Sequence, residues 1–142
     1  MTHAMFRSTL RLSLLLTLFL TLASCGNSDG APPTVKLAET DSGSSVVLRQ
    51  GQMLEVSLPE NGTTGYLWEI VPGTESILSA QGSSYAATNS TDQTMVGGGG
   101  MRTFTFMAAA SGSAALRIIL RQPWMTNVAP AKSFEAAITV VN

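Results

Sequence analysis

The sequence has little of what most catalytic sites require. Its 142 residues include one His and one Cys. A Ser-His-Asp triad needs a histidine, a Cys-His pair needs both residues, and a structural zinc site usually needs several of them. Because His3 and Cys25 both lie within the first 25 residues, the composition favours a protein that is not an enzyme and holds neither a metal ion nor a cofactor.

Charged and aromatic residues are also scarce. Charged residues make up 12% of the chain and aromatic residues 6%, whereas 13 residues are Gly. This balance is typical of a turn-rich protein with short strands rather than of a helical bundle. Beyond residue 24 the chain carries six basic and nine acidic side chains, a formal charge of −3. We expect no nucleic-acid partner, because nucleic acid calls for a basic face.

The first residues predict an export signal. Arg7 and Arg11 form a positively charged region before an apolar run at 12–22, which is shorter than the about 20 apolar residues that span a membrane. The run ends in an apolar residue, two small residues and Cys25, an order that is similar to the cleavage box of bacterial lipoproteins. We expect residues 1–24 to be a lipoprotein signal peptide, removed before a lipidated Cys25. The alternative is an ordinary signal peptide followed by a chance Cys.

This interpretation also predicts the organisation and the location of the mature chain. Residues 25–33 would be the lipidated Cys and a flexible tether with a stiffer Pro-Pro end, and residues 34–142 would be one domain. Acylated Cys25 would attach the protein to a lipid membrane without spanning it. The expected location is the bacterial cell envelope, at the outer membrane or facing the periplasm if the cell has two membranes.

Beyond the tether, apolar and polar residues alternate with a period of two. Leu54, Val56 and Leu58, for example, alternate with Glu55 and Ser57. Such alternation is typical of half-buried antiparallel strands. We therefore expect an all-β fold, an antiparallel β-sandwich of about seven or eight strands, with a small barrel as the alternative. The expected strands are 35–39, 45–49, 54–58, 68–70, 78–85, 104–108, 116–120 and 134–140, and 49–52 and 110–113 are expected to be hairpin turns.

Three connections between the expected strands carry unusual residues. The first consists of Asn61, Gly62, Thr63, Thr64, Gly65 and Tyr66; the second of Gly97, Gly98, Gly99 and Gly100; the third of Arg121, Gln122, Pro123 and Trp124. Each also has a simple explanation, because Asn-Gly is a common turn, four glycines often form a linker, and a Trp after a strand often packs under a loop.

Taken in order, the three connections resemble the chagasin family of cysteine-protease inhibitors. Members of that family carry an Asn-Pro-Thr-Thr-Gly-Tyr/Phe loop, a Gly-x-Gly-Gly loop and an Arg-Pro-Trp loop, and Trp68 also fits the family pattern. The resemblance spans about residues 46–142. It implies an immunoglobulin-like β-sandwich that is a reversible, non-covalent inhibitor of papain-like cysteine proteases, with the three loops at one end wedging into the active-site cleft.

A wedge of this kind needs no nucleophile. The resemblance implies that Thr63 and Thr64 lie over the catalytic centre of the protease, where their hydroxyls can form hydrogen bonds. Glycine-rich loops allow close backbone approach, and Trp124 is the natural anchor because interfaces favour Trp as a hot spot. Two residues depart from the family pattern, Gly62 in place of Pro and Gln122 in place of Arg. Arg121 is a doubtful substitute, because neighbouring residues of a strand point to opposite sides.

Two other hypotheses remain open. The chain could be an envelope-anchored structural or adhesion module that binds another protein or a polymer through the same loops, and the two departures favour this alternative. A glycosidase-type enzyme would need two paired carboxylates. Nothing in the spacing of the acidic residues pairs any two of Glu55, Glu60, Glu69, Glu75 and Asp92.

Overall fold

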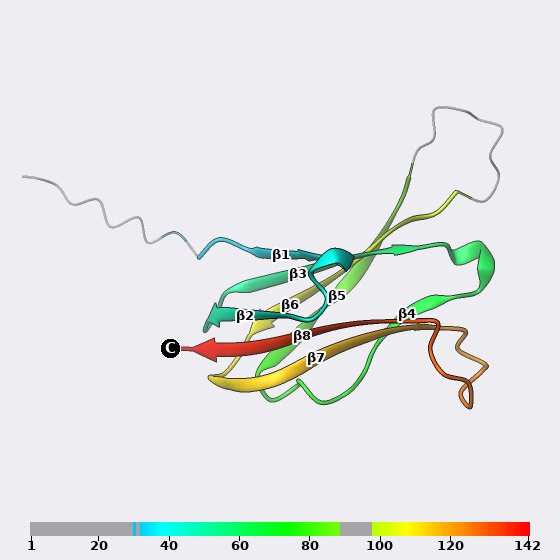
Figure 1. Ribbon diagram of the computed structural model, residues 1–142. Coiled ribbons are helices and arrows are strands. Elements are labelled where there is room, and N and C mark those ends of the chain that lie inside the picture. Colours follow the sequence, from blue (N-terminus) through cyan, green and yellow to red (C-terminus); the bar gives the residue numbers. More distant parts are fainter. Residues whose placement is uncertain (1–29, 31, 89–97) are drawn as a thin grey trace, which may run out of the picture.

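The computed structural model describes residues 30, 32–88 and 98–142, and their fold consists of two packed β-sheets (Figure 1). The expected signal peptide, Cys25, most of the tether, Gly97 and Asp92 lie outside the described residues. All eight expected strands are present in the described part, and the β-sandwich is confirmed. The strands are β1 (Val35–Ala38), β2 (Ser44–Arg49), β3 (Met53–Glu60), β4 (Leu67–Ile70), β5 (Leu78–Ala87), β6 (Gly100–Ala108), β7 (Gly112–Arg121) and β8 (Lys132–Val141), with one-turn helices η1 (Glu39–Asp41) and η2 (Gly62–Thr64).

Both sheets are mixed, so the expectation of a purely antiparallel sandwich is wrong at one edge of each. The strand order is β1-β3-β6-β5 in one sheet and β2-β8-β7-β4 in the other. β1 pairs with β3 in parallel, β2 pairs with β8 in parallel, and the remaining pairs are antiparallel. The reason is that β2 lies in the opposite sheet. The chain therefore reverses twice between β1 and β3, and the two strands enter the same sheet in the same direction.

The two expected hairpin turns are corners that join the two sheets. Residues 49–52 connect β2 to β3, and residues 110–113 lead from β6 into β7, so each changes sheet instead of pairing its flanking strands. The first corner is held by backbone hydrogen bonds from Gln50 N–H to the Val141 carbonyl at 2.8 Å and from Gly51 N–H to the Ala108 carbonyl at 2.7 Å. The turn residues were informative, but they do not encode which sheet the next strand joins.

The core is formed by the inward rows of the alternating strands. Leu54, Val56 and Leu58 of β3 are fully buried, as are Phe106 of β6 and Phe134 of β8. Burial of each such side chain contributes about 1.5–3 kcal/mol, so apolar packing between the sheets holds the domain together. No helix among the described residues is long and apolar enough to cross a membrane.

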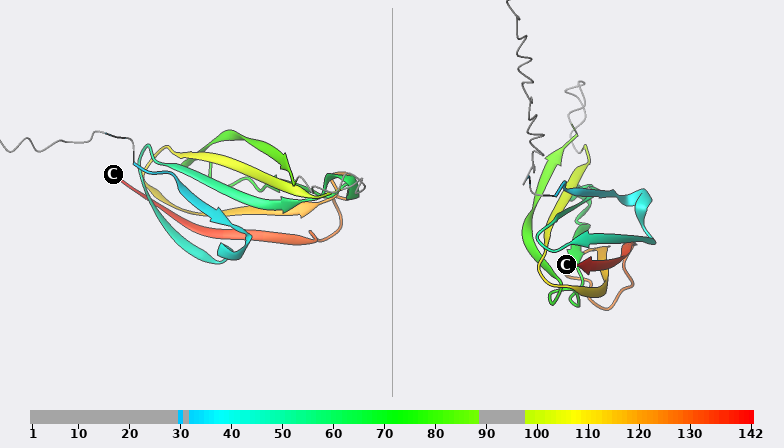
Figure 2. Two further views of the ribbon diagram at one scale, coloured as in Figure 1. Left: turned by 90° about the horizontal axis from the view of Figure 1, so that it is seen from above. Right: turned by 90° about the vertical axis from the view of Figure 1, so that its left-hand side faces the viewer.

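The strands that lead into the three candidate loops, β3, β5 and β7, all finish at one end of the sandwich, which we call the loop end (Figure 2). We use loop 1 for residues 61–66, loop 2 for the described residues 88, 98 and 99 between β5 and β6, and loop 3 for 122–131. The C-terminus and the start of β1 lie at the opposite end (Figures 1 and 2). There the Gln52 side chain donates to the Pro33 carbonyl at 2.7 Å and attaches the incoming chain to the β2–β3 corner.

Candidate functional site

Loop 1 is a single helical turn that is held by its own polar groups. The Asn61 side-chain oxygen accepts hydrogen bonds from the Thr63 backbone N–H at 3.2 Å and from the Thr63 hydroxyl at 2.6 Å, as a helix N-cap does. The Thr64 hydroxyl donates to the Asn61 carbonyl at 2.7 Å. Both hydroxyl protons are thus directed into the loop, and the acceptor capacity of the threonine oxygens is what they offer a partner.

Loop 3 is attached to loop 1 in two places. The Gln122 side-chain amide donates to the Thr64 carbonyl at 3.3 Å. The Trp124 ring lies against Gly65, where an added Cβ would come within 2.6 Å of the ring atom Cη2. Gly65 also has a φ of +75°, a backbone conformation that favours glycine. Only glycine meets both conditions, so the indole packs directly on the backbone of loop 1.

The tip of loops 1 and 3 exposes apolar side chains. Trp124 is 68% exposed although its edge contacts loop 1, so it is not a tryptophan buried beneath a loop. Val128, Met125 and Tyr66 are also exposed, and these three line one small pocket. We call the exposed apolar side chains of loops 1 and 3 the apolar tip, and exposed apolar side chains gathered in this way are typical of a surface that another molecule covers.

The glycine run of loop 2 divides into two parts. Gly97 lies outside the described residues, and Gly98 and Gly99 form the described end of the loop. The Gly99 carbonyl accepts a hydrogen bond from the Thr88 N–H at 3.0 Å, which closes the base of loop 2. The main chain of Gly98 and Gly99 lies beside loop 1 along one groove.

Gly100 is not a loop residue, contrary to its assignment from sequence. It is the buried first residue of β6 and pairs with Glu60 on one side and Ala87 on the other. An added Cβ would collide with the Ala86 carbonyl oxygen and would meet the Tyr85 ring at 2.6 Å. Here glycine lets β5 approach closely, both its backbone and its tyrosine, which explains its place at the end of the run.

The charge of Arg121 is paired within the sheet and is not presented at the apolar tip. Its guanidinium forms two hydrogen bonds with the Glu69 carboxylate, at 2.8 and 3.1 Å, across the β4–β7 pair. Gln122, the next residue, faces loop 1 instead. The alternation along the end of β7 therefore separates the two side chains, as the sequence suggested.

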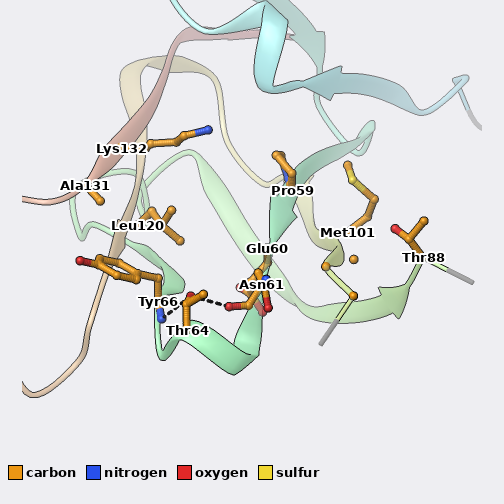
Figure 3. Close-up of a pocket in the computed structure, with 13 residues that line it drawn as sticks. Pro59, Glu60, Asn61, Thr64, Tyr66, Thr88, Met101, Leu120, Ala131 and Lys132 are labelled. Atoms are coloured by element: carbon orange, nitrogen blue, oxygen red, sulfur yellow. Dashed lines mark hydrogen bonds between the residues drawn. The ribbon is translucent and has the colours of Figure 1, made fainter. Parts of the chain in front are cut away.

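A groove of about 640 Å³ runs between loop 1, the described glycines of loop 2 and the start of β8 (Figure 3). Tyr66 and Leu120 line one side of the groove, and Pro59 and Met101 line the other (Figure 3). Lys132 lies at its margin and donates to the Glu39 carboxylate at 2.7 Å. The groove is thus largely apolar, with its cation already paired.

Sequence reasoning missed an ion pair at the base of loop 1. Glu60, which looked like one of several scattered surface acids, is 4% exposed and forms a two-pronged pair with Arg102. The hydrogen bonds that Arg102 donates to the Glu60 carboxylate raise the pKa of Arg102 above its ordinary value. A signal was present, because both residues continue the inward rows of their strands, Glu60 after Leu58 and Arg102 before Phe104.

The other described acidic residues considered for catalysis, all but Asp92, are also engaged. Glu55 pairs with Lys36 at 3.0 Å, Glu69 pairs with Arg121, and Glu75 accepts the Gly73 N–H at 2.8 Å. Over residues 30, 32–88 and 98–142, no group of three His, Cys, Asp or Glu side chains is arranged to hold a metal ion.

The fold defines the class of the protein as an immunoglobulin-like β-sandwich, with the candidate site residues of the described loops at one end. Its overall shape is shared by solved structures. The cysteine protease inhibitor EhICP2 from Entamoeba histolytica aligns with a TM-score of 0.68 at 19% identity, over 76% of this chain and 96% of the other. PbICP-C, solved in complex with falcipain-2, aligns with a TM-score of 0.51 at 16% identity, over 82% of this chain and 95% of the other.

Sequence comparison identifies the family. The family model described as "Chagasin family peptidase inhibitor I42" matches residues 47–138. Chagasin from Trypanosoma cruzi is 28% identical over 94 residues, which are 63% of this chain and 82% of the relative. The chain belongs to the chagasin family of peptidase inhibitors, whose members are protease inhibitors and not enzymes.

Proposed function

We propose that this protein inhibits papain-like cysteine proteases reversibly and without a covalent bond, by inserting its loop end into the active-site cleft. The observation that carries the proposal is the joining of loops 1 and 3 into one unit, through Gln122 and through the contact of Trp124 with Gly65. Family membership supports inhibition, and the falcipain-2 complex of the neighbour PbICP-C supports a cysteine protease as the partner.

The geometry suits a rigid wedge. Loop 1 is already hydrogen-bonded internally, so a protease would gain a binding surface without ordering a flexible segment. Trp124 presents most of its indole to solvent and is available for burial against a cleft wall. Gly98 and Gly99 have no side chains to hold a partner's backbone away. The chain supplies shape and hydrogen-bond acceptors, and no chemistry on the substrate is required.

We also propose that the domain is held on a bacterial membrane by a lipid on Cys25, after removal of residues 1–24. The described chain enters the sandwich at the end opposite the loops, where Pro33 is bonded to Gln52. A tether of residues 25–33, fully extended at about 3.3 Å per residue, would reach roughly 30 Å. In this arrangement the three loops point away from the membrane, towards a protease in the aqueous phase.

Titration of the chain from residue 26 against papain and cathepsin-like enzymes tests the proposed inhibition. All strands and the whole core lie between Val35 and Val141, so this chain keeps the complete described fold. We expect inhibition that Trp124→Ala and Thr63→Ala each weaken and that Arg49→Ala, at the opposite end, leaves unchanged. Absence of inhibition across the panel at micromolar concentration refutes the proposal, and recovery of a non-protease partner in a pull-down favours the adhesion alternative.

A further inference from the structure

An ion pair between a buried carboxylate and a partly exposed guanidinium closes the base of loop 1. Glu60 is the residue before the loop, and Trp68 lies two residues beyond its end. The Glu60 carboxylate accepts the Trp68 backbone N–H at 3.1 Å, and the Trp68 indole N–H donates to the Pro59 carbonyl at 2.8 Å. The two chain segments that enter and leave loop 1 are therefore held together by two polar contacts, one of them on the Glu60 carboxylate.

Arg102 connects this base to the strands that carry loop 2. Its guanidinium donates to Glu60 Oε1 at 2.7 Å through one terminal nitrogen and to Oε2 at 3.3 Å through Nε. The same guanidinium lies over the Tyr85 ring, 5.3 Å from the ring centre. Arg102 is on β6 and Tyr85 on β5, the two strands that flank loop 2. Loop 1 and loop 2 thus share one charged contact at their bases.

Stability alone does not account for this pair. A buried ion pair contributes little net stability, because desolvation of both charges offsets their attraction, and apolar side chains of similar volume often serve as well. Glu60 and Arg102 interrupt inward rows that are otherwise apolar. What a bidentate pair supplies and apolar contacts do not is a fixed direction. A residue at the base of a loop uses that property to fix the angle at which the loop leaves the sheet.

We propose that Glu60 and Arg102 are positioning residues that hold loop 1 against the strands of loop 2 in the geometry that binds a protease. This inference rests on the proposed function, but it makes a separate claim about the free protein. Replacement of the pair should loosen loop 1 before any protease is added. The hydrogen bonds of the Thr64 and Gly65 amides within loop 1, to the carbonyls of Asn61 and Gly62, report on that loosening.

The test uses the double variant Glu60→Gln with Arg102→Leu in the chain from residue 26. The Gln oxygen still accepts the Trp68 N–H, and Leu fills the space of the guanidinium stem, so no buried charge is left unpaired. We expect the melting temperature to stay within a few degrees of wild type, while exchange of the Thr64 and Gly65 amides, measured by NMR, rises about tenfold or more. Inhibition of papain should weaken by a similar factor.

Two further variants make the result specific. The same substitutions at an exposed pair, Glu135→Gln with Arg117→Leu, remove a 3.0 Å ion pair of β7 and β8 in mid-sheet and should change neither amide exchange nor inhibition. Arg102→Lys keeps the charge but loses the planar fork. It should therefore inhibit more weakly than wild type and more strongly than the Glu60→Gln/Arg102→Leu variant. A purely structural role predicts that inhibition follows the melting temperature through the whole series.

The outcomes separate this inference from the proposed function. Unchanged amide exchange in the Glu60→Gln/Arg102→Leu variant overturns the positioning role, and so does faster exchange with full inhibition. If wild type inhibits no protease, the proposed function fails and the role in protease binding fails with it. In that case the exchange measurement still decides whether the pair positions loop 1.

Discussion

Removal of the Trp124 indole should affect inhibition far more than folding. Trp124 is 68% exposed in the free protein. A Trp side chain buries about 150–250 Å² when it is fully covered, so roughly 100–170 Å² remains for a partner to bury. At about 25 cal/mol per Å² this area is worth about 2.5–4 kcal/mol, within the range of interface hot spots. Trp124→Ala should therefore weaken inhibition roughly 60- to 700-fold, since about 1.4 kcal/mol is a factor of ten.

The assay is competitive titration of papain with a fluorogenic peptide substrate, together with thermal unfolding of the same samples. About a third of the indole is buried against loop 1, so the variant should lose only about 1–2 kcal/mol of stability. Val47→Ala is the matched control, because Val47 is 65% exposed on β2, an edge strand outside the loop end. A Trp124→Ala protein that inhibits within threefold of wild type would show that the apolar tip does not enter the cleft.

Three changes in loop 1 test its rigidity. Gly62→Pro should tighten inhibition about two- to fivefold. Gly62 begins η2 without a positive φ, so proline fits there and stabilises the folded loop by about 0.4–1 kcal/mol through lower entropy of the free chain. Looser binding in the same titration contradicts this. Asn61→Ala should weaken inhibition about fivefold through loss of a cap worth about 1 kcal/mol, and NMR should show faster exchange of the Thr63 amide. Gly65→Ala should cost tenfold or more in inhibition, because it strains the backbone by about 1–2 kcal/mol and displaces Trp124, and an unchanged tryptophan emission spectrum would oppose that reasoning.

Period-two alternation identified the strands because each strand has one face in the core. Leu54, Val56 and Leu58 could be placed inward from sequence alone, and the structure buries all three. The same alternation does not specify which strands pair with each other, since a strand with one apolar face fits either sheet. This is why the turn residues of 49–52 and 110–113 predict hairpins, although these segments carry the chain from one sheet to the other.

The loop residues were located from their motifs, but their contacts depend on strand register. Leu67 at the start of β4 lies opposite Arg121 at the end of β7, and this register brings Gln122 to the Thr64 carbonyl. No local pattern in the sequence specifies that pairing. Glu60 was missed for a different reason. The alternation places Glu60 in the inward-facing row of its strand, but a lone Glu is usually exposed, and its partner Arg102 is 42 residues away.

The two departures from the family pattern can be understood together. Gly62 gives up the restriction that proline imposes on the first loop, which by itself makes loop 1 more flexible. Gln122 replaces a cation with an amide, and that amide donates to the Thr64 carbonyl of the same loop. The Asn61 cap and the contact of Trp124 with Gly65 add two more restraints. Order in loop 1 therefore comes from hydrogen bonds within the loop and from its contacts with loop 3, rather than from a proline at position 62. It follows that proline at position 62 should gain less in wild type than in a Gln122→Ala background, where one of those contacts is absent.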